Sequence, residues 1–153
     1  MGDAAVRIGA DMARAVPSFR VREDGNCFVC GDNNLIGLKL KFKMVDGGIE
    51  TTFIPQSEHQ GFVGIVHGGF IGMVLDEAMA KLLYLQGIEA LTCEITVRLH
   101  RVARVTEPLT IKAHLLAVRK RVFDLEAWAA KQNGEWVASA SAKFLLVGRD
   151  GSE

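Results

Sequence analysis

The feature that most constrains the fold is one long apolar segment, followed by strands with no second helix. Residues 66–86 read as a helix that ends at Gly87, and its apolar residues leave little room for a solvent face. Four segments of alternating polarity follow: 91–102, 109–118, 122–132 and 135–147. Parallel strands would need a helix between them, so these four are expected to form an antiparallel meander.

Two shorter strands are expected before the helix, at residues 37–44 and 49–54, with a turn at Gly47-Gly48 between them. The order is therefore two strands, one helix and four strands. We predict an α+β fold in which a largely antiparallel sheet of about six strands wraps around one long central helix. This domain is expected to span residues 26–148. A tail or short helix would precede it at 1–25, and a tail would follow at 149–153.

The composition narrows the possible partners. The 153 residues include 18 basic and 18 acidic side chains, so no bulk attraction to nucleic acid or to a membrane surface is expected. No uncharged apolar run of about 18 residues is present, and the N-terminus lacks the apolar block of a signal peptide. Three cysteines without a secretion signal favour free thiols in a reducing cytoplasm.

The cysteines raise the question of a metal. Cys27 and Cys30 form a CxxC pair, but no second pair exists, and Cys93 lies in an apolar strand. A four-ligand zinc site would lack ligands unless histidines or a second subunit supplied them. Turn residues follow at 31–34. We interpret the pair as small thiols packed beneath a turn and expect no metal.

Two acids in the apolar helix, Asp76 and Glu77, also require an explanation, because an unpaired buried carboxylate is costly. Adjacent helical side chains diverge by about 100°. Lys81 lies four residues after Glu77, so that pair is predicted to form an ion pair. Asp76 has no such partner. It is either solvated, bonded to a strand, or functional.

The start of the helix carries His67-Gly68-Gly69. A helix N-terminus exposes free backbone N–H groups and the positive end of the helix dipole. Without Cβ atoms at the glycines, a substrate oxygen can approach these donors, as in an oxyanion hole. The alternative is that the glycines only permit tight packing.

These features together resemble the hotdog-fold acyl-CoA thioesterases, and within them the phenylacetyl-CoA thioesterase branch and relatives of human thioesterase superfamily members 4 and 5. The resemblance covers about residues 26–147. It rests on the element order and on an acid nine residues after the histidine of HGG. The segments that carry it are NCFVCGDNNLIGLKLKF, HQGFVGIVHGGFIGMVLDEAM and CEITVRLHRV.

The resemblance implies a dimer or tetramer with acyl-CoA sites at the subunit interface and no cofactor beyond the coenzyme A of the substrate. It implies that the Gly68 N–H polarises the thioester carbonyl, with His67 nearby. Asp76 of the other subunit would act as general base or as nucleophile. Thr92 matches a position that helps to hold the attacking water, although it is also an ordinary strand residue.

Other site residues are implied with less detail. Many relatives carry an Asn or Gln, whose amide assists the carbonyl, where this chain has Gly61. His59 or Gln60 of the same loop could take the place of that amide. Gly69 and Met73 would also face the substrate. The apolar pocket is expected to include Phe62, Val63, Met73, Met79, Leu82 and Leu83. The cations proposed for the phosphates of coenzyme A, which could equally be solvated rims, are Arg98, Arg101, Arg104, Arg119, Lys120 and Arg121.

The predicted function is therefore hydrolysis of an acyl-CoA to the free acid and coenzyme A. One alternative is a non-catalytic module that binds acyl-CoA. Another is a hydroxyacyl-thioester dehydratase or hydratase, which would need a histidine in a different local motif. The acyl group and the pathway do not follow from the sequence, although Met and Leu suit a medium or long chain or an aryl group.

Overall fold

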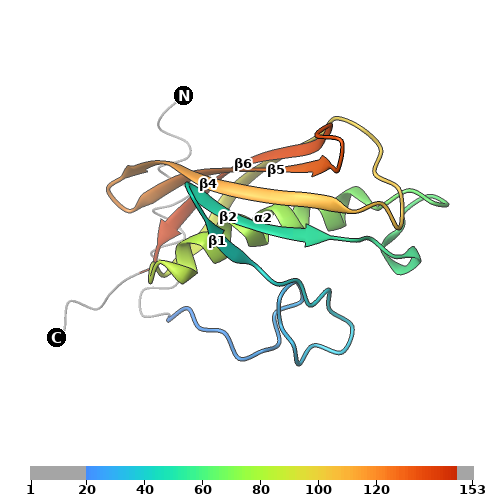
Figure 1. Ribbon diagram of the computed structural model, residues 1–153. Helices are drawn as coiled ribbons and strands as arrows, with labels where there is room; N and C mark the ends of the chain where they lie inside the picture. The colour runs from blue at the N-terminus through green and yellow to red at the C-terminus, as the bar shows by residue number, and fades with distance from the viewer. Residues whose placement is uncertain (1–19, 148–153) are drawn as a thin grey trace.

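The structure, a computed structural model, describes residues 20–147 of the chain, so most of the predicted N-terminal segment and the C-terminal tail lie outside the described residues. One long helix, α2, packs on one face of a single sheet of six strands (Figure 1). A short 3-10 helix, η1 (Ser57–His59), precedes it. The elements are β1 (Lys43–Val45), β2 (Gly48–Phe53), α2 (Gly68–Leu85), β3 (Ala90–Leu99), β4 (Leu109–Arg119), β5 (Val122–Lys131) and β6 (Trp136–Leu146).

The sheet confirms the predicted α+β architecture. Its strand order is β1-β2-β4-β5-β6-β3, and every neighbouring pair is antiparallel. The predicted four-strand meander is wrong for its first strand, because β3 pairs with β6 rather than with β4. Burial alternates along β5, as expected for a strand with one face on the core. The core lies between this face and α2, whose buried side chains are Ile71, Val74, Leu75, Ala78, Met79, Leu82 and Leu83.

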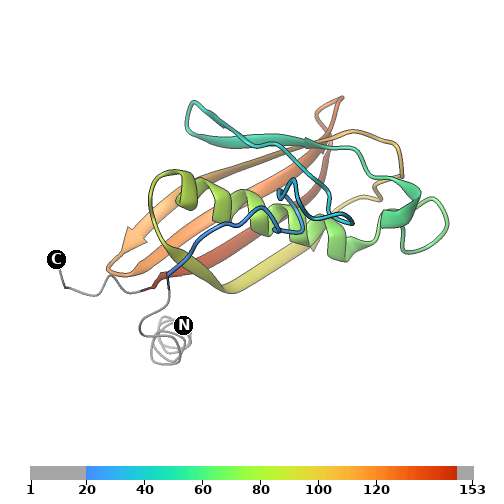
Figure 2. The same ribbon diagram turned by 90° about the horizontal axis from the view of Figure 1, so that it is seen from below.

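Residues 20–40 form a strap that crosses α2 on the side opposite the sheet (Figure 2). Within it, the N–H groups of Leu38 and Leu40 donate to the carbonyls of Phe28 and Val29, both at 2.8 Å. The predicted strand at 37–44 is wrong over most of its length, because β1 covers only Lys43–Val45. The strap takes up the backbone bonds of residues 38 and 40, and Lys39 has a left-handed φ of 51° that interrupts an extended strand.

The helix is not buried all round, contrary to the expectation from its composition. The side chains of Met73 and Leu85 are 37% and 48% exposed. Met73 lies on the side of α2 opposite its buried side chains, whereas Leu85 is the last residue of the helix. Within the described part of the chain, no helix combines the length and the hydropathy needed to cross a lipid bilayer.

Strand β3 lies at one edge of the sheet and pairs only with β6. Its register shifts between Thr92 and Glu94, so Cys93 forms a β-bulge. Further along β3, Val97 and Leu99 face the helix, because they are the side chains nearest to Gly72 and Gly68 of α2. Within residues 20–147, this edge strand covers one flank of α2, and its outer backbone edge has no partner strand.

Candidate active site

The first half of the candidate site is the start of α2. His67 is the N-cap residue, and its Nδ1 accepts a hydrogen bond from the Gly69 N–H at 2.9 Å. The Phe70 N–H donates to the His67 carbonyl at 3.0 Å. The Gly68 N–H has no acceptor within residues 20–147. It is the free donor at the positive end of the helix dipole.

Both interpretations of the glycine at the helix start have structural support. A Cβ built on Gly68 would lie 2.6 Å from Cδ1 of Leu99, so the helix approaches β3 closely there. The Leu99 side chain is 55% exposed and can turn aside. Packing against Leu99 therefore favours glycine at position 68 only moderately. The free N–H, by contrast, is a property of the backbone at this position.

The loop before α2 is built around the helix start. The His67 N–H donates to the His59 carbonyl at 2.8 Å, and the Gly61 N–H donates to the Ile65 carbonyl at 2.9 Å. The Gln60 Oε1 accepts from the Gly64 N–H at 3.0 Å. Residues 59, 60, 61, 67, 68 and 69, which were predicted as site residues, therefore form one contiguous group.

The His59 ring has a defined place in this loop. Its Nδ1 accepts from the Gln56 N–H at 2.9 Å. The ring lies between Phe53 and Phe70, with centroid distances of 5.6 and 5.0 Å. Because Nδ1 is an acceptor, the proton of a neutral His59 is on Nε2.

The second half of the candidate site lies midway along α2. Asp76 Oδ1 accepts a hydrogen bond from the Thr92 hydroxyl of β3 at 2.8 Å. Burial raises the pKa of the Asp76 carboxyl above its ordinary value, and the Thr92 hydroxyl partly opposes this shift by stabilising the carboxylate. The half-buried acid is thus held by a strand residue, one of the alternatives that the sequence left open.

The bulge at Cys93 explains how Thr92 reaches Asp76. Val97 and Leu99 face α2, and side chains alternate along a strand. In a regular strand Thr92 would therefore point to the opposite face. The extra residue at Cys93 reverses the alternation and turns Thr92 toward the helix.

One chain does not bring the two halves together. Asp76 follows Gly68 by eight residues, which corresponds to about 12 Å along the helix axis. A single thioester carbonyl cannot contact both groups across that distance. Met73 lies between them on the part-exposed side of α2.

Glu77 does not form the predicted ion pair with Lys81. The Lys81 ammonium instead pairs with Glu23 of the strap at 2.5 Å. The Glu77 Oε1 lies 3.5 Å from Cys27 Sγ and 3.1 Å from Cys30 Sγ. The strap, far from α2 in sequence, supplies closer partners than the helix does, and no local sequence signal indicated this cluster.

The predicted pocket residues divide into two groups. Phe62 and Val63 are 83% and 91% exposed at the tip of the loop before α2. Met79, Leu82 and Leu83 are at most 2% exposed and belong to the core under the sheet. The interpretation of these three as pocket lining is wrong within the single chain, because they occupy the sheet-facing side of the helix.

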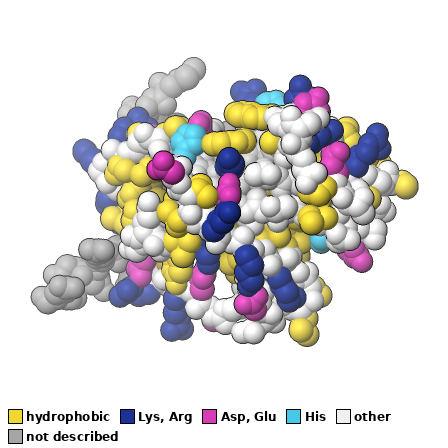
Figure 3. Space-filling model, viewed as in Figure 1, with side chains coloured by type: hydrophobic (Ala, Val, Ile, Leu, Met, Phe, Trp, Pro, Cys, Tyr) yellow, Lys and Arg dark blue, Asp and Glu magenta, His cyan; other side chains and the backbone are white. Residues whose placement is uncertain are grey.

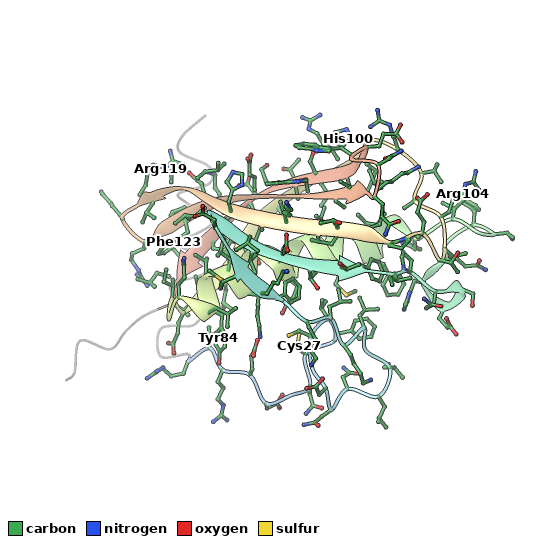
Figure 4. The ribbon with its side chains drawn as sticks, in the orientation of Figure 1. Cys27, Tyr84, His100, Arg104, Arg119 and Phe123 are labelled. Atoms are coloured by element: carbon green, nitrogen blue, oxygen red, sulfur yellow. The ribbon has the colours of Figure 1, made fainter. Side chains whose placement is uncertain are left out.

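The candidate phosphate-binding cations also divide into two groups. Arg104 lies near the start of α2, whereas Arg119 lies at the other end of the sheet with the β4–β5 turn (Figure 4). Lys120 and Arg121 belong to that same turn. Two of the cations are already paired: Arg101 with Glu135 at 3.3 Å, and Arg119 with Asp124 at 2.5 Å.

The remaining cations offer no single basic patch. Arg98 lines a cavity of about 220 Å³ with Trp128 and Trp136 on the outer face of the sheet. Dark-blue basic side chains are spread over the visible face and alternate with magenta acidic ones (Figure 3). Arg104 is joined to the loop before α2 through its backbone bridge with Ile65.

Residues 63–135 match the Thioesterase superfamily, a segment that includes the helix start, Asp76 and Thr92. No curated protein matched the chain. The predicted resemblance to hotdog-fold thioesterases agrees with this match, and the predicted fold is confirmed by solved structures.

Three solved structures illustrate the similarity. A phenylacetic acid degradation-related protein of Ralstonia eutropha has a TM-score of 0.67 at 23% identity, over 91% of this chain and 99% of that one. The E. coli PaaI protein of the phenylacetic acid degradation operon has a TM-score of 0.68 at 21% identity, over 72% and 81%. A hypothetical thioesterase of Streptococcus pneumoniae, solved with coenzyme A, has a TM-score of 0.67 at 19% identity, over 72% and 87%.

The Streptococcus pneumoniae protein was also solved as two single alanine variants, one at a threonine and one at an aspartate. These residues are 16 positions apart in that chain, which is also the separation of Asp76 and Thr92.

Proposed function

We propose that this chain, which has the hotdog fold and matches the Thioesterase superfamily, hydrolyses acyl-CoA thioesters to a free acid and coenzyme A. The observation that carries the proposal is the Asp76–Thr92 pair, a half-buried carboxylate held at 2.8 Å by a strand hydroxyl. A buried acid of raised pKa in such a position is typical of a reactive group.

The electrophilic half is assigned to the helix start. The Gly68 N–H would donate to the thioester oxygen, and its hydrogen bond would strengthen as negative charge develops on that oxygen. The helix dipole adds to this stabilisation. His67 shapes the site by capping the helix through Gly69.

Two routes are open to the Asp76 carboxylate. As general base, it takes a proton from water while the water oxygen bonds to the carbonyl carbon; the C–S bond then breaks and the coenzyme A sulfur receives the proton. As nucleophile, its oxygen bonds to the carbonyl carbon and expels the thiolate, and water then hydrolyses the resulting anhydride. In both routes, Thr92 positions the carboxylate.

A second copy of the chain would complete the site. In the described part of the chain, the outer edge of β3 has no partner strand, so it can pair with β3 of another copy. The side chains of Ile95 and Leu99 on this strand are 38% and 55% exposed. A two-fold axis at this edge would bring Asp76 of one protomer toward the helix start of the other. In this arrangement, the helix start and the acid, which are about 12 Å apart within one chain, would meet across the interface between two chains.

Coenzyme A is the proposed carrier because a structural neighbour was solved with it. The matched spacing of the altered threonine and aspartate in that neighbour further supports Asp76 and Thr92 as the functional pair. Arg104, beside the loop that precedes α2, is the strongest candidate among the predicted cations for a phosphate contact.

The test is release of coenzyme A from a panel of acyl-CoAs, followed with a chromogenic thiol reagent. We expect turnover of at least one medium-chain, long-chain or aromatic acyl-CoA. Binding of acyl-CoA without turnover would contradict the proposal and favour a non-catalytic binding module. Conversion of hydroxyacyl-CoA to enoyl-CoA without thiol release would favour a dehydratase.

A further inference from the structure

A second cluster of reactive side chains lies beside the candidate site and has no part in the proposed hydrolysis. Cys27 and Cys30 of the strap point toward Glu77 of α2, and one donor atom from each of the three lies within 4.8 Å of the others. All three side chains are half-buried. The cluster therefore lies at the contact between the strap and the helix (Figure 4, near the label of Cys27).

The distances in this cluster match those between the ligands of a tetrahedral zinc ion. With Zn–S of about 2.3 Å and Zn–O of about 2.0 Å, tetrahedral geometry separates a sulfur from an oxygen ligand by about 3.5 Å. The Glu77 Oε1 lies 3.5 Å from Cys27 Sγ and 3.1 Å from Cys30 Sγ. Both sulfurs converge on the same carboxylate oxygen and all three atoms lie within 4.8 Å of one another, so one ion could contact all three.

The backbone holds the two cysteines in this arrangement. The Gly31 N–H donates to the Cys27 carbonyl at 2.8 Å, which closes the turn. A Cβ on Gly31 would lie 2.4 Å from the Gly25 carbonyl oxygen and 2.6 Å from the Cys27 nitrogen. Only glycine fits at this position, so the CxxCG segment is a rigid turn that presents both sulfurs on one side.

The surrounding charges favour a divalent cation. Two thiolates and the Glu77 carboxylate carry three negative charges, and a zinc ion would leave one. The Lys81 ammonium lies 3.8 Å from Cys30 Sγ and also pairs with Glu23, so it offsets part of the remaining negative charge. Glu23 Oε1, which lies 3.8 Å from Cys30 Sγ, is a further oxygen atom near the cluster.

We propose that Cys27, Cys30 and Glu77 bind one zinc ion, which ties the strap to α2. Thiolate-rich, four-coordinate sites prefer zinc among the common divalent cations. The inference does not rest on the proposed hydrolysis, because none of these three residues is assigned to that reaction.

The test uses the purified full-length protein, stripped of metal under anaerobic conditions and titrated with Co²⁺ as a spectroscopic probe. We expect thiolate-to-cobalt charge-transfer absorption in the near ultraviolet that saturates at one equivalent and is displaced by Zn²⁺. Zinc should also protect two of the three thiols from a chromogenic thiol reagent. Absence of both signals in the wild type would overturn the proposal.

Variants assign the ligands. Cys30→Ser and Glu77→Gln should weaken cobalt binding at least tenfold, whereas Cys93→Ser is the matched control. Cys93 lies in β3 and its thiol donates to the Lys143 carbonyl at 3.2 Å, so its loss should leave the absorption and the two protected thiols unchanged. Loss of the signal in Cys93→Ser, with retention in Cys30→Ser, would contradict the assignment.

Discussion

At the scale of single residues, the proposed reaction depends on Asp76, whose carboxyl is half-buried and bonded to Thr92. Asp76→Asn should lower kcat by at least about a hundredfold. The same change should raise the thermal midpoint at neutral pH. Burial raises the folded-state pKa of this carboxyl, so the wild type loses stability as pH rises through that pKa, and Asn does not.

Both effects can be measured on one preparation. Thermal unfolding of wild type and Asp76→Asn across acidic to neutral pH should show a difference in midpoint that shrinks toward acid. The wild-type rate should fall as pH decreases through the raised pKa, because the carboxylate is the active form. An Asp76→Asn enzyme with full activity would remove Asp76 from the mechanism, and Glu77 would then be tested.

Thr92 is assigned as a positioning residue, and a pair of substitutions isolates its hydroxyl. Thr92→Val keeps the shape but removes the donor to Asp76, so kcat should fall roughly ten- to hundredfold. The acid limb of the pH–rate profile should also move to higher pH, because loss of the hydrogen bond that stabilises the carboxylate raises the pKa of Asp76 further. Thr92→Ser should retain most activity. An unmoved acid limb in Thr92→Val would indicate a merely structural role.

The Gly68 N–H can be deleted without breaking the helix. Gly68 is the first residue of α2, where proline is well tolerated, and His67 has the extended conformation that a following proline requires. Gly68→Pro should reduce kcat about a hundredfold or more with little change in KM. Gly68→Ala, which keeps the N–H and adds a similar contact with Leu99, is the control and should remain active.

At the scale of elements, the strap and the helix use glycine for different reasons. A Cβ on Gly31 would meet backbone atoms at 2.4 to 2.7 Å, whereas one on Gly72 would meet only Val97 at an ordinary 3.5 Å. Gly31→Ala should therefore destabilise the protein by about 2 kcal/mol or more. Gly72→Ala, inside the helix, should stabilise it by about 0.5–1 kcal/mol. Urea unfolding of both variants checks this contrast, and equal effects would contradict it.

At the scale of the whole molecule, the separated half-sites predict complementation between subunits. Asp76→Asn and Gly68→Pro should each be nearly inactive alone. Unfolded together and refolded as a mixture, they should recover about a quarter of wild-type activity. Half of the dimers would be mixed, and each mixed dimer would contain one intact site. No recovery from a mixture shown to contain mixed dimers would place both halves of the site in one chain.

Much of this protein could be predicted from its sequence, because local patterns encode it. The period of polarity indicated the helix at 66–86 and the four strands after it, and all five elements are found within a few residues of their predicted ends. The order of these strands in the sheet was predicted wrongly, because β3 pairs with β6 and not with β4. Turn and capping chemistry is also local: His67 precedes two glycines and caps α2. The motif that singled out Gly68, Asp76 and Thr92 likewise depends on spacing along the chain.

Only the tertiary structure decided what these residues contact. Thr92 reaches Asp76 because a bulge at Cys93 reverses the alternation of β3, and a bulge has no signature in a periodic pattern. Glu77 meets Cys27 and Cys30 rather than Lys81 because the strap crosses the helix. Local sequence determined which elements form, whereas contacts between distant segments determined the chemistry that each side chain can perform.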